Sequence, residues 1–410
     1  MKTVWRIAIT YLVLTVLFTG AMVGVFCIPQ SAVGDNVRQS VEQVTAGGKM
    51  FTASIGPVEP FKIGTFSDCL ILGIAYCGDN SHPLQAAMND IFMMRDGSPI
   101  TGARQMFDHT QDEELLPVVY SRYWHGNQTI IKPLLCVTTV RGMRIINTVL
   151  LALLLIALLA ALWRRVGRGE ALIVTVSLLA VMVPSVPLCL NYVPTFYIAL
   201  TASLLILLWH PATASRGNTA VLFFVIGALT TFMDLLTTPM VALAVPLVVY
   251  MLYHRPRRTW RAVISLSLAW LLGYASLWAT KWLLAALITG HAAFTDAMSA
   301  ITQRTVGHDE QDYMAWCLKT TAASFVGVTA VVAAVTALLG KSREALRRNS
   351  WMLLVALSSY VWAFVLLEHT WHHMHFTWRT FVVLIIGIGL FWYSSLDIRH
   401  PLRLFKKTSQ

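Results

Sequence analysis

The sequence predicts an all-α polytopic membrane protein with about ten transmembrane helices. Two observations support this fold class: 56% of the 410 residues are hydrophobic while 12% are charged, and apolar runs recur along the chain. Each run has about 18 to 22 residues, the length that a helix needs to cross the hydrocarbon core of a bilayer. This composition excludes a soluble enzyme.

The apolar runs define the candidate spans. In chain order they are residues 7–28, 143–162, 170–188, 191–209, 219–236, 238–253, 262–287, 317–339, 351–368 and 376–393. The third to the sixth are short or contain prolines, and a membrane helix tolerates a proline only where neighbouring groups bind the freed carbonyl. These prolines are Pro184, Pro187, Pro194, Pro239 and Pro246.

The first apolar run is predicted to be a membrane anchor and not a cleaved signal. Lys2 and Arg6 precede it, as they would in a signal, but the run is about 20 residues long, whereas the apolar region of a signal has about 7 to 15. The predicted organisation is therefore an anchor helix at 1–28, an extracytoplasmic segment at 29–141, a multi-helix transmembrane domain at 142–393 and a basic cytoplasmic tail at 394–410.

The basic residues predict how the spans are oriented. If the N-terminus is cytoplasmic, the inner connections hold more than half of the 31 basic residues and only Glu170, Glu344 and Asp397 among the acids. This distribution follows the positive-inside rule and predicts a multi-pass protein of the cell membrane with both termini in the cytoplasm. The net charge of +11 then indicates contact with anionic membrane lipids, and nucleic acid is not expected as a partner.

The long segment 29–141 is predicted to lie outside, where a connection of this length usually has a function. Two of its stretches, "TFSDCLILGIAYC" at 65–77 and "LLPVVYSRYWHG" at 115–126, are apolar and aromatic. We expect both to form short helices at the membrane surface. Cys69, Cys77 and Cys136 are on the same side; a bridge between Cys69 and Cys77 and free thiols are both compatible with the spacing.

Three acidic positions compete for the role of a general base. Asp68 is set among apolar residues, an environment that raises the pKa of a carboxyl group. A carboxylate of this kind suits proton abstraction, and the alternative is a capping or salt-bridged aspartate. Asp35 and the cluster at 112–114 are the other candidates in the outer segment.

The motif "YSRYWHG" is predicted to bind a ligand that contains both phosphate and sugar. Arg122 can contact a phosphate through two hydrogen bonds, and Tyr123 and Trp124 offer ring faces on which a sugar stacks, with His125 beside them. Lys132 follows, as a phosphate contact or as an anchor to lipid headgroups. An interfacial aromatic belt with an arginine reaching to the headgroups is the alternative reading.

Asp234 in "LTTFMDLLTTP" is an ionisable residue at membrane depth, and such a residue indicates a functional site. Asp234 is therefore a further candidate for a catalytic role. Lys281, near the outer end of the seventh span, is the expected partner and a candidate substrate contact. A purely structural pair between the two is the alternative.

"EHTWHHMHFTWR", residues 368–379, is predicted to face the same side as the long segment. His369 and His373 would lie one turn apart on a helix. With Glu368 nearby they could hold a divalent metal, although a good site needs a third ligand. Donation of hydrogen bonds to a phosphate, together with Arg379, is the favoured prediction. Anchoring at the bilayer surface is the alternative.

Together these motifs resemble those of poorly characterised bacterial multipass membrane proteins, whose architecture is similar to that of the GT-C class of membrane glycosyltransferases. Two departures stand out: Met233 replaces an aromatic residue, and Glu368 replaces an asparagine. The acidic pair that the GT-C class carries soon after its first span is also missing, which leaves the base undefined. The matching positions are Arg122, Trp124, His125, Asp234, Thr237, Pro239, His369, His373 and Arg379.

The resemblance implies a glycosyltransferase that moves a sugar from a polyprenyl-phosphate donor to a glycan, lipid or protein acceptor of the cell envelope. An outer carboxylate would deprotonate the acceptor while Arg, Lys and His side chains hold the leaving phosphate. A transporter or flippase for a lipid-linked or anionic substrate is the alternative, because proline-bearing helices and charged groups at membrane depth suit it too. A non-catalytic scaffold would leave the outer charges unexplained.

Overall fold

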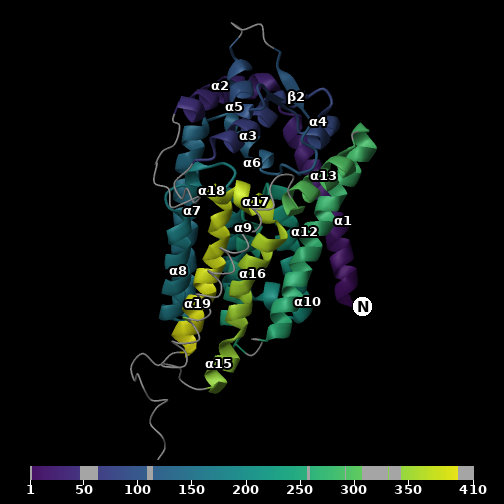
Figure 1. The fold of residues 1–410 in the computed structure, drawn as a ribbon. Coiled ribbons are helices and arrows are strands. Elements are labelled where there is room, and N and C mark those ends of the chain that lie inside the picture. Colours follow the sequence, from purple (N-terminus) through teal and green to yellow (C-terminus); the bar gives the residue numbers. More distant parts are fainter. Residues whose placement is uncertain are drawn as a thin grey trace, which may run out of the picture.

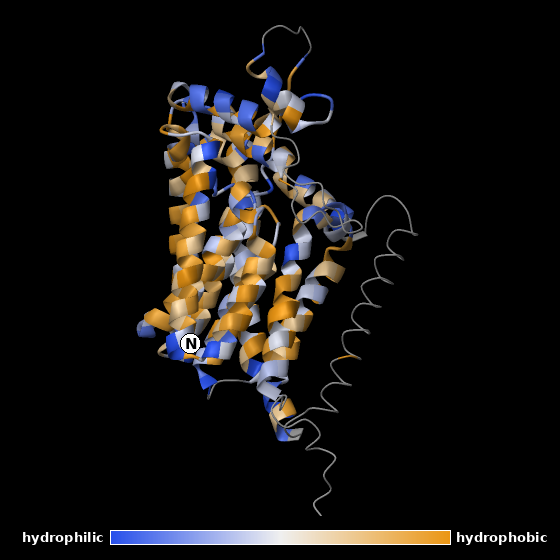
Figure 2. Ribbon diagram, turned by 90° about the vertical axis from the view of Figure 1, so that its left-hand side faces the viewer, coloured by the Kyte–Doolittle hydropathy of each residue, from blue (hydrophilic) through white to orange (hydrophobic). Residues whose placement is uncertain are grey.

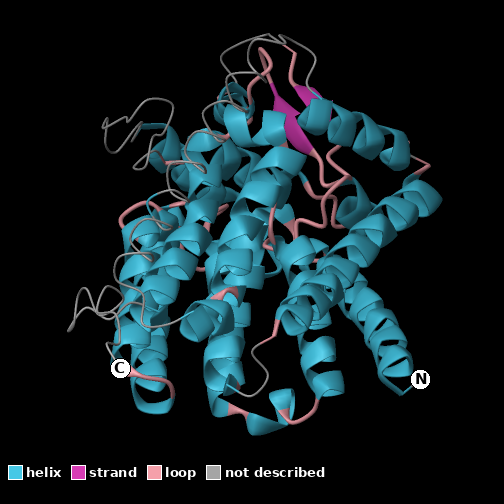
Figure 3. Cartoon of the chain, turned by 60° about the horizontal axis from the view of Figure 1, so that its bottom comes forward, coloured by secondary structure: helices cyan, strands magenta, loops and turns pink. Residues whose placement is uncertain are grey.

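The computed structural model describes residues 2–46, 63–108, 114–255, 259–290, 292–306, 331 and 343–395. Helices make up most of this part of the chain (Figure 3), and they form a bundle with a layer of short helices across one end (Figure 1). We call that layer the cap. It contains α2 (Gln30–Ala46), α3 (Thr65–Cys77), α4 (Pro83–Asn89), α5 (Pro99–Gln105), α6 (Gln128–Leu135) and the antiparallel strands β1 (Phe92–Met94) and β2 (Leu116–Val118).

The bundle consists of the long helices and the short segments that connect them. The long helices are α1 (Lys2–Phe26), α7 (Val140–Arg165), α8 (Arg168–Met182), α9 (Val193–Leu208), α10 (Arg216–Met233), α11 (Pro239–Tyr253), α12 (Trp260–Thr289), α16 (Trp351–Val365) and α19 (Val382–Ser395). The short segments are η1 (Val186–Leu188), η2 (His210–Thr213), α13 (Ala293–Val306), α15 (Arg343–Asn349), α17 (Leu367–His372), α18 (Met374–Thr377) and η4 (Trp378–Phe381).

The described chain is all-α apart from two short strands, and five of its helical segments are long and apolar enough to cross a membrane: α1, α7, α10, α12 and Met374–Ser395. Hydrophobic residues run along the bundle, and hydrophilic ones gather at its two ends (Figure 2). Shorter apolar helices include α9, α11 and α16. The predicted span 317–339 lies outside the described residues, apart from Val331, so the number of ten spans remains a prediction.

Local sequence signals set the ends of the long helices. The Ser215 hydroxyl accepts a hydrogen bond from the amide of Asn218 at the start of α10, and Thr259 does the same for Ala262 at the start of α12. Such caps satisfy amides that have no partner within the helix. Gly290 ends α12 with φ of 69°, a left-handed conformation that glycine adopts without steric cost.

The closest contact in the bundle joins α10 and α12 through two glycines. A Cβ at Gly227 would lie 2.0 Å from the Trp270 carbonyl oxygen, and a Cβ at Gly273 would lie 2.0 Å from the Phe224 carbonyl oxygen. The two backbones can approach this closely because neither position carries a side chain. Small residues at membrane helix interfaces commonly have this role.

Two predictions for the outer segment need correction. The stretch 115–126 is β2 followed by a turn and not a helix; Pro117 lacks the amide that a helix interior uses, and His125 has φ of 51°. The other stretch is helical as predicted, but residues 68–75 of α3 are buried, so α3 packs inside the cap and is not an exposed surface helix of the protein.

The described cysteines are free, so Cys69 and Cys77 do not form a bridge. Both lie on α3, and eight residues of helix place them about 12 Å apart along its axis, which is beyond the reach of a disulfide. Burial raises the pKa of each thiol to about 12.

Candidate functional site

A cavity of about 520 Å³ lies where the cap meets the bundle. We call it the cap cavity. Segments that are far apart in the sequence form its walls, including the first turn of α3, the turn after α10, α13 and the histidine-rich segment. The lining residues are Thr45, Ile63, Gly64, Thr65, Phe66, Ser67, Leu70, Ile100, Tyr120, Asn191, Leu235, Arg304, His369, His373, His375 and Phe376.

Two of the predicted histidines line this cavity together. The rings of His369 and His373 lie 4.7 Å apart between centroids, as the predicted helical spacing requires. His369 is buried, and its Nε2 lies 2.8 Å from the Leu236 carbonyl oxygen, which connects this segment to the turn between α10 and α11. Burial lowers the pKa of His369 well below its usual value and that of His373 to about 3. Both imidazoles are therefore neutral near pH 7.

Arg304 on α13 also lines the cavity. Its guanidinium donates a hydrogen bond to the Tyr123 hydroxyl and lies 5.5 Å above the Tyr123 ring. Within the described part of the chain, no carboxylate lies at ion-pair distance from it. Sequence reasoning missed Arg304, because its neighbours form no apolar run or motif and its contacts come from residues more than 170 positions away.

After Arg304, the first turn of α3 is a second source of positive potential in the cavity. Gly64 stands at the N-cap and no side chain caps this end of the helix. Backbone amides at a helix N-terminus carry partial positive charge and bind anions. Gly64 also packs closely, because a Cβ there would lie 3.3 Å from the Tyr192 hydroxyl oxygen.

Among the residues that the structure describes, the lining contains one arginine, three histidines and no carboxylate. Tyr120, Phe66 and Phe376 add aromatic surface. This arrangement can accept a phosphate through the Arg304 guanidinium and neutral imidazole donors, with ring faces available for a sugar. It contains no acidic group that could act as a base.

The predicted carboxylates do not line the cavity. The Asp68 side chain is 0% exposed and accepts a hydrogen bond from the Leu190 amide at 2.9 Å, with Arg144 at 3.4 Å. Burial raises the pKa of Asp68 to about 7, although Arg144 opposes the shift. Asp68 thus fastens α3 to α7 and to the chain before α9. The Asp35 side chain is 92% exposed and pairs with Arg38 at 3.7 Å.

The predicted pair between Asp234 and Lys281 is wrong. Lys281 Nζ lies 2.7 Å from Asp90 Oδ2 and donates to the Ala87 carbonyl at 2.7 Å, so its partner comes from the cap. Asp234 instead accepts hydrogen bonds from the Thr237 amide at 2.9 Å and from the Thr237 hydroxyl. It organises the turn before α11, a turn in which Leu236 has φ of 65°.

The motif at 120–126 is mostly a structural junction. The Arg122 guanidinium is paired with Asp296 at 2.9 Å, and its carbonyl accepts hydrogen bonds from two tryptophans of α12. Trp124 is buried and donates to the Leu277 carbonyl at 2.7 Å. His125 is buried in a left-handed conformation, with Nε2 at 3.3 Å from the Tyr120 carbonyl. Tyr123 contributes indirectly, through Arg304.

Neither Lys132 nor Arg379 lines the cavity. Lys132 is buried with Nζ 4.9 Å from the centre of the Phe26 ring, and burial lowers its pKa to about 8. Arg379 is fully buried and does not line the cavity, so the predicted contact of Arg379 with a phosphate is not supported. It donates to the His375 carbonyl at 2.9 Å and lies 4.6 Å from the centre of the Tyr192 ring. Arg379 therefore supports the lining residue His375 from behind the cavity wall.

No group of three metal-binding side chains occurs among the described residues. Glu368, the expected third ligand, pairs instead with His372 at 3.1 Å. No protein-family model, curated protein or solved structure matches the sequence.

Proposed function

We propose that the chain is a membrane glycosyltransferase that takes a sugar from a polyprenyl-phosphate donor bound in the cap cavity. The observation that carries the proposal is the composition of the lining: Arg304, three histidines and the N-terminus of α3, with no carboxylate in the described part of the wall. These groups suit a phosphate. The adjoining bundle supplies apolar surface for the polyprenyl chain.

The orientation follows from charge. The bundle end opposite the cap carries Arg164, Arg165, Arg216, Arg261 and Arg347. By the positive-inside rule this end faces the cytoplasm, and the cap faces outside. A donor that is already linked to a lipid would then reach the cap cavity from the outer leaflet.

The transfer is a single displacement at the anomeric carbon. The acceptor hydroxyl oxygen forms the new bond to that carbon, the bond to the phosphate oxygen breaks, and its electron pair leaves with polyprenyl phosphate. Arg304 and the first turn of α3 stabilise the negative charge on the leaving phosphate. The neutral imidazole of His373 accepts the acceptor's proton, and a bound phosphate raises the pKa of this group because the two charges attract. Asp68, Asp35 and Asp234 have no part in this scheme.

A transporter or flippase is the second candidate. Buried side chains of Tyr192, Leu236 and Phe376 fill the bundle beside the cavity. This packing favours chemistry at one face over passage through the bundle.

The test uses purified protein in proteoliposomes that contain a polyprenyl-phosphate sugar and candidate acceptors. We expect free polyprenyl phosphate to accumulate. Arg304→Gln should slow its release by about tenfold or more, because a charged hydrogen bond to phosphate contributes about 1.5–3 kcal/mol. Arg38→Gln in the cap is the matched control, since Arg38 is exposed and pairs with Asp35. Movement of intact donor across the bilayer without cleavage would support the transporter instead.

A further inference from the structure

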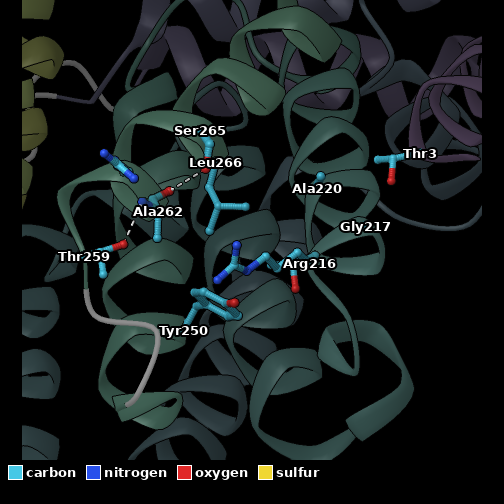
Figure 4. Close-up of a pocket in the computed structure, with 11 residues that line it drawn as sticks. Thr3, Arg216, Gly217, Ala220, Tyr250, Thr259, Ala262, Ser265 and Leu266 are labelled. Atoms are coloured by element: carbon cyan, nitrogen blue, oxygen red, sulfur yellow. Dashed lines mark hydrogen bonds between the residues drawn. The ribbon is translucent and has the colours of Figure 1, made fainter. Parts of the chain in front are cut away.

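A second cavity, also about 520 Å³ in volume, lies at the bundle end opposite the cap (Figure 4). We call it the basic-end cavity. It is formed where α1, α10, α11 and α12 meet, and Thr3, Arg216, Thr219, Tyr250, Arg261 and Leu266 are among its lining residues. The proposed transfer reaction makes no use of it.

Two guanidinium groups from different helices give the basic-end cavity its charge. Arg216 begins α10, and Arg261 lies in the first turn of α12. In Figure 4 the Arg216 side chain turns from α10 towards the middle of the cavity, beside the ring of Tyr250. The lining contains no carboxylate, and over the described ranges neither arginine has an ion-pair partner. The cavity is therefore an unneutralised cationic site.

Hydrogen-bonding groups accompany the two charges. Hydroxyl groups of Thr259 and Ser265 line the cavity, and α10 and α12 both begin at it, so that their dipoles add positive potential. Guanidinium groups bind phosphate through paired hydrogen bonds. The expected ligand is thus an anion and not a neutral sugar, and a phosphate offers enough acceptor oxygens for both guanidinium groups.

One side of the cavity is apolar and points to the source of this phosphate. Ala262 and Leu266 line it, and the same part of α12 exposes large apolar side chains along a neighbouring groove between α11, α12 and α16: Ile264 is 51% exposed and Leu268 is 59% exposed. A bilayer must cover these side chains, so the cavity opens beside acyl chains. A phospholipid can place its headgroup at the arginines and its chains along α12.

We propose that the basic-end cavity binds the phosphate of an anionic phospholipid from the leaflet that this end faces. The bound lipid bridges α10 and α12, the two helices that the glycine contact also joins. The proposal is independent of the proposed transferase activity, since it concerns a different end of the molecule.

The test measures the binding of phosphatidylglycerol to the purified full chain in phosphatidylcholine nanodiscs by native mass spectrometry. The double variant Arg216→Gln/Arg261→Gln should lower the affinity on the order of tenfold. The control is Arg347→Gln/Arg348→Gln, which removes the same charge from α15 at the same end and should leave binding within about twofold. Thermal unfolding of both variants verifies that they are folded.

Three results would overturn the proposal. Equal losses in the two double variants would mean that the whole basic surface attracts anionic lipid without a defined site. Unchanged binding in the Arg216/Arg261 variant would exclude these residues. If inorganic phosphate displaces phosphatidylglycerol and binds as tightly in its absence, the site takes free phosphate and not a lipid headgroup.

Discussion

At the scale of single residues, the buried charges show how the cap is attached to the bundle. Lys281 of α12 pairs with Asp90, 191 positions earlier in the chain, and Asp68 of α3 pairs with Arg144 of α7. Burial raises the pKa of Asp90 to about 7, against the opposing effect of the Lys281 ammonium. A buried charge is stable only with such a partner, so each pair fastens a cap element to a bundle helix.

Removal of one member of the Lys281 and Asp90 pair should lower the free energy of unfolding far more than removal of both. Lys281→Met leaves a buried carboxylate without its cation and should lower the free energy of unfolding by about 3–5 kcal/mol. Adding Asp90→Asn should restore most of this loss. Asparagine also tolerates the left-handed backbone at position 90, where φ is 49°. Unfolding in detergent measures both variants, and equal destabilisation by the single and the double change would contradict the pairing.

His125 predicts a pH dependence of stability. Burial lowers its pKa well below the usual 6.5, so the folded protein keeps His125 neutral while the unfolded chain takes up a proton below about pH 6.5. Stability should therefore fall as the pH drops below 6.5, by up to about 1.4 kcal/mol per pH unit for this group.

The variant His125→Asn removes the titrating group and is compatible with the left-handed conformation. Unfolding midpoints of both proteins at pH 7.5 and pH 5.5 test the prediction. The wild type should lose more stability on acidification than the variant. Identical losses would show that His125 is protonated in the folded state.

The sequence predicted that the charged residues at membrane depth need partners, but not which partners. Asp234 and Lys281 lie at similar predicted depths, and this alone suggested a pair. The actual partner, Asp90, belongs to a helix end in the cap, a position that apolar periodicity cannot define. Arg304 was missed for the same reason, because only the folded chain places it beside Tyr123 and the histidines.

At the scale of elements, the apolar runs predicted the long helices well. The starts of α7, α10 and α12 agree with the predicted spans to within three residues. The prediction failed at 115–126, where hydrophobic and aromatic residues lie in a strand and a turn. Burial explains Tyr123 and Trp124 in the turn, whereas Leu116 in the strand is 55% exposed. An apolar residue is compatible with either setting, so composition alone does not define the backbone conformation.

The contact between α10 and α12 gives a prediction at this scale. Gly227→Ala would place a Cβ 2.0 Å from a backbone oxygen of α12, and a backbone atom cannot move aside as a flexible side chain can. We expect a loss of about 1–3 kcal/mol or more. Gly20→Ala on α1 is the control, because nothing lies within 4 Å of the added Cβ, and it should be neutral or stabilising by about 0.5–1 kcal/mol. Equal unfolding midpoints for the two variants would contradict the close packing.

At the scale of the whole molecule, two cavities of similar volume lie at opposite ends of the bundle and differ in their surroundings. The cap cavity is lined by three histidines, Arg304 and a helix N-terminus beneath a folded cap, whereas the basic-end cavity lies between two exposed arginines, with exposed apolar residues of α12 nearby. The long segment 29–141 and the stretch "EHTWHHMHFTWR" are far apart in the sequence. Both contribute residues to the wall of the cap cavity.

The most direct test of the central proposal is photo-crosslinking with a polyprenyl phosphate that carries a photoreactive group near the phosphate. The labelled peptides are identified by mass spectrometry after reaction with the purified protein. The proposal predicts adducts within 63–70, at Arg304 and within 369–376, with an excess of unlabelled polyprenyl phosphate suppressing them. Adducts confined to the lipid-facing surfaces of the bundle helices, unaffected by that competitor, would contradict it.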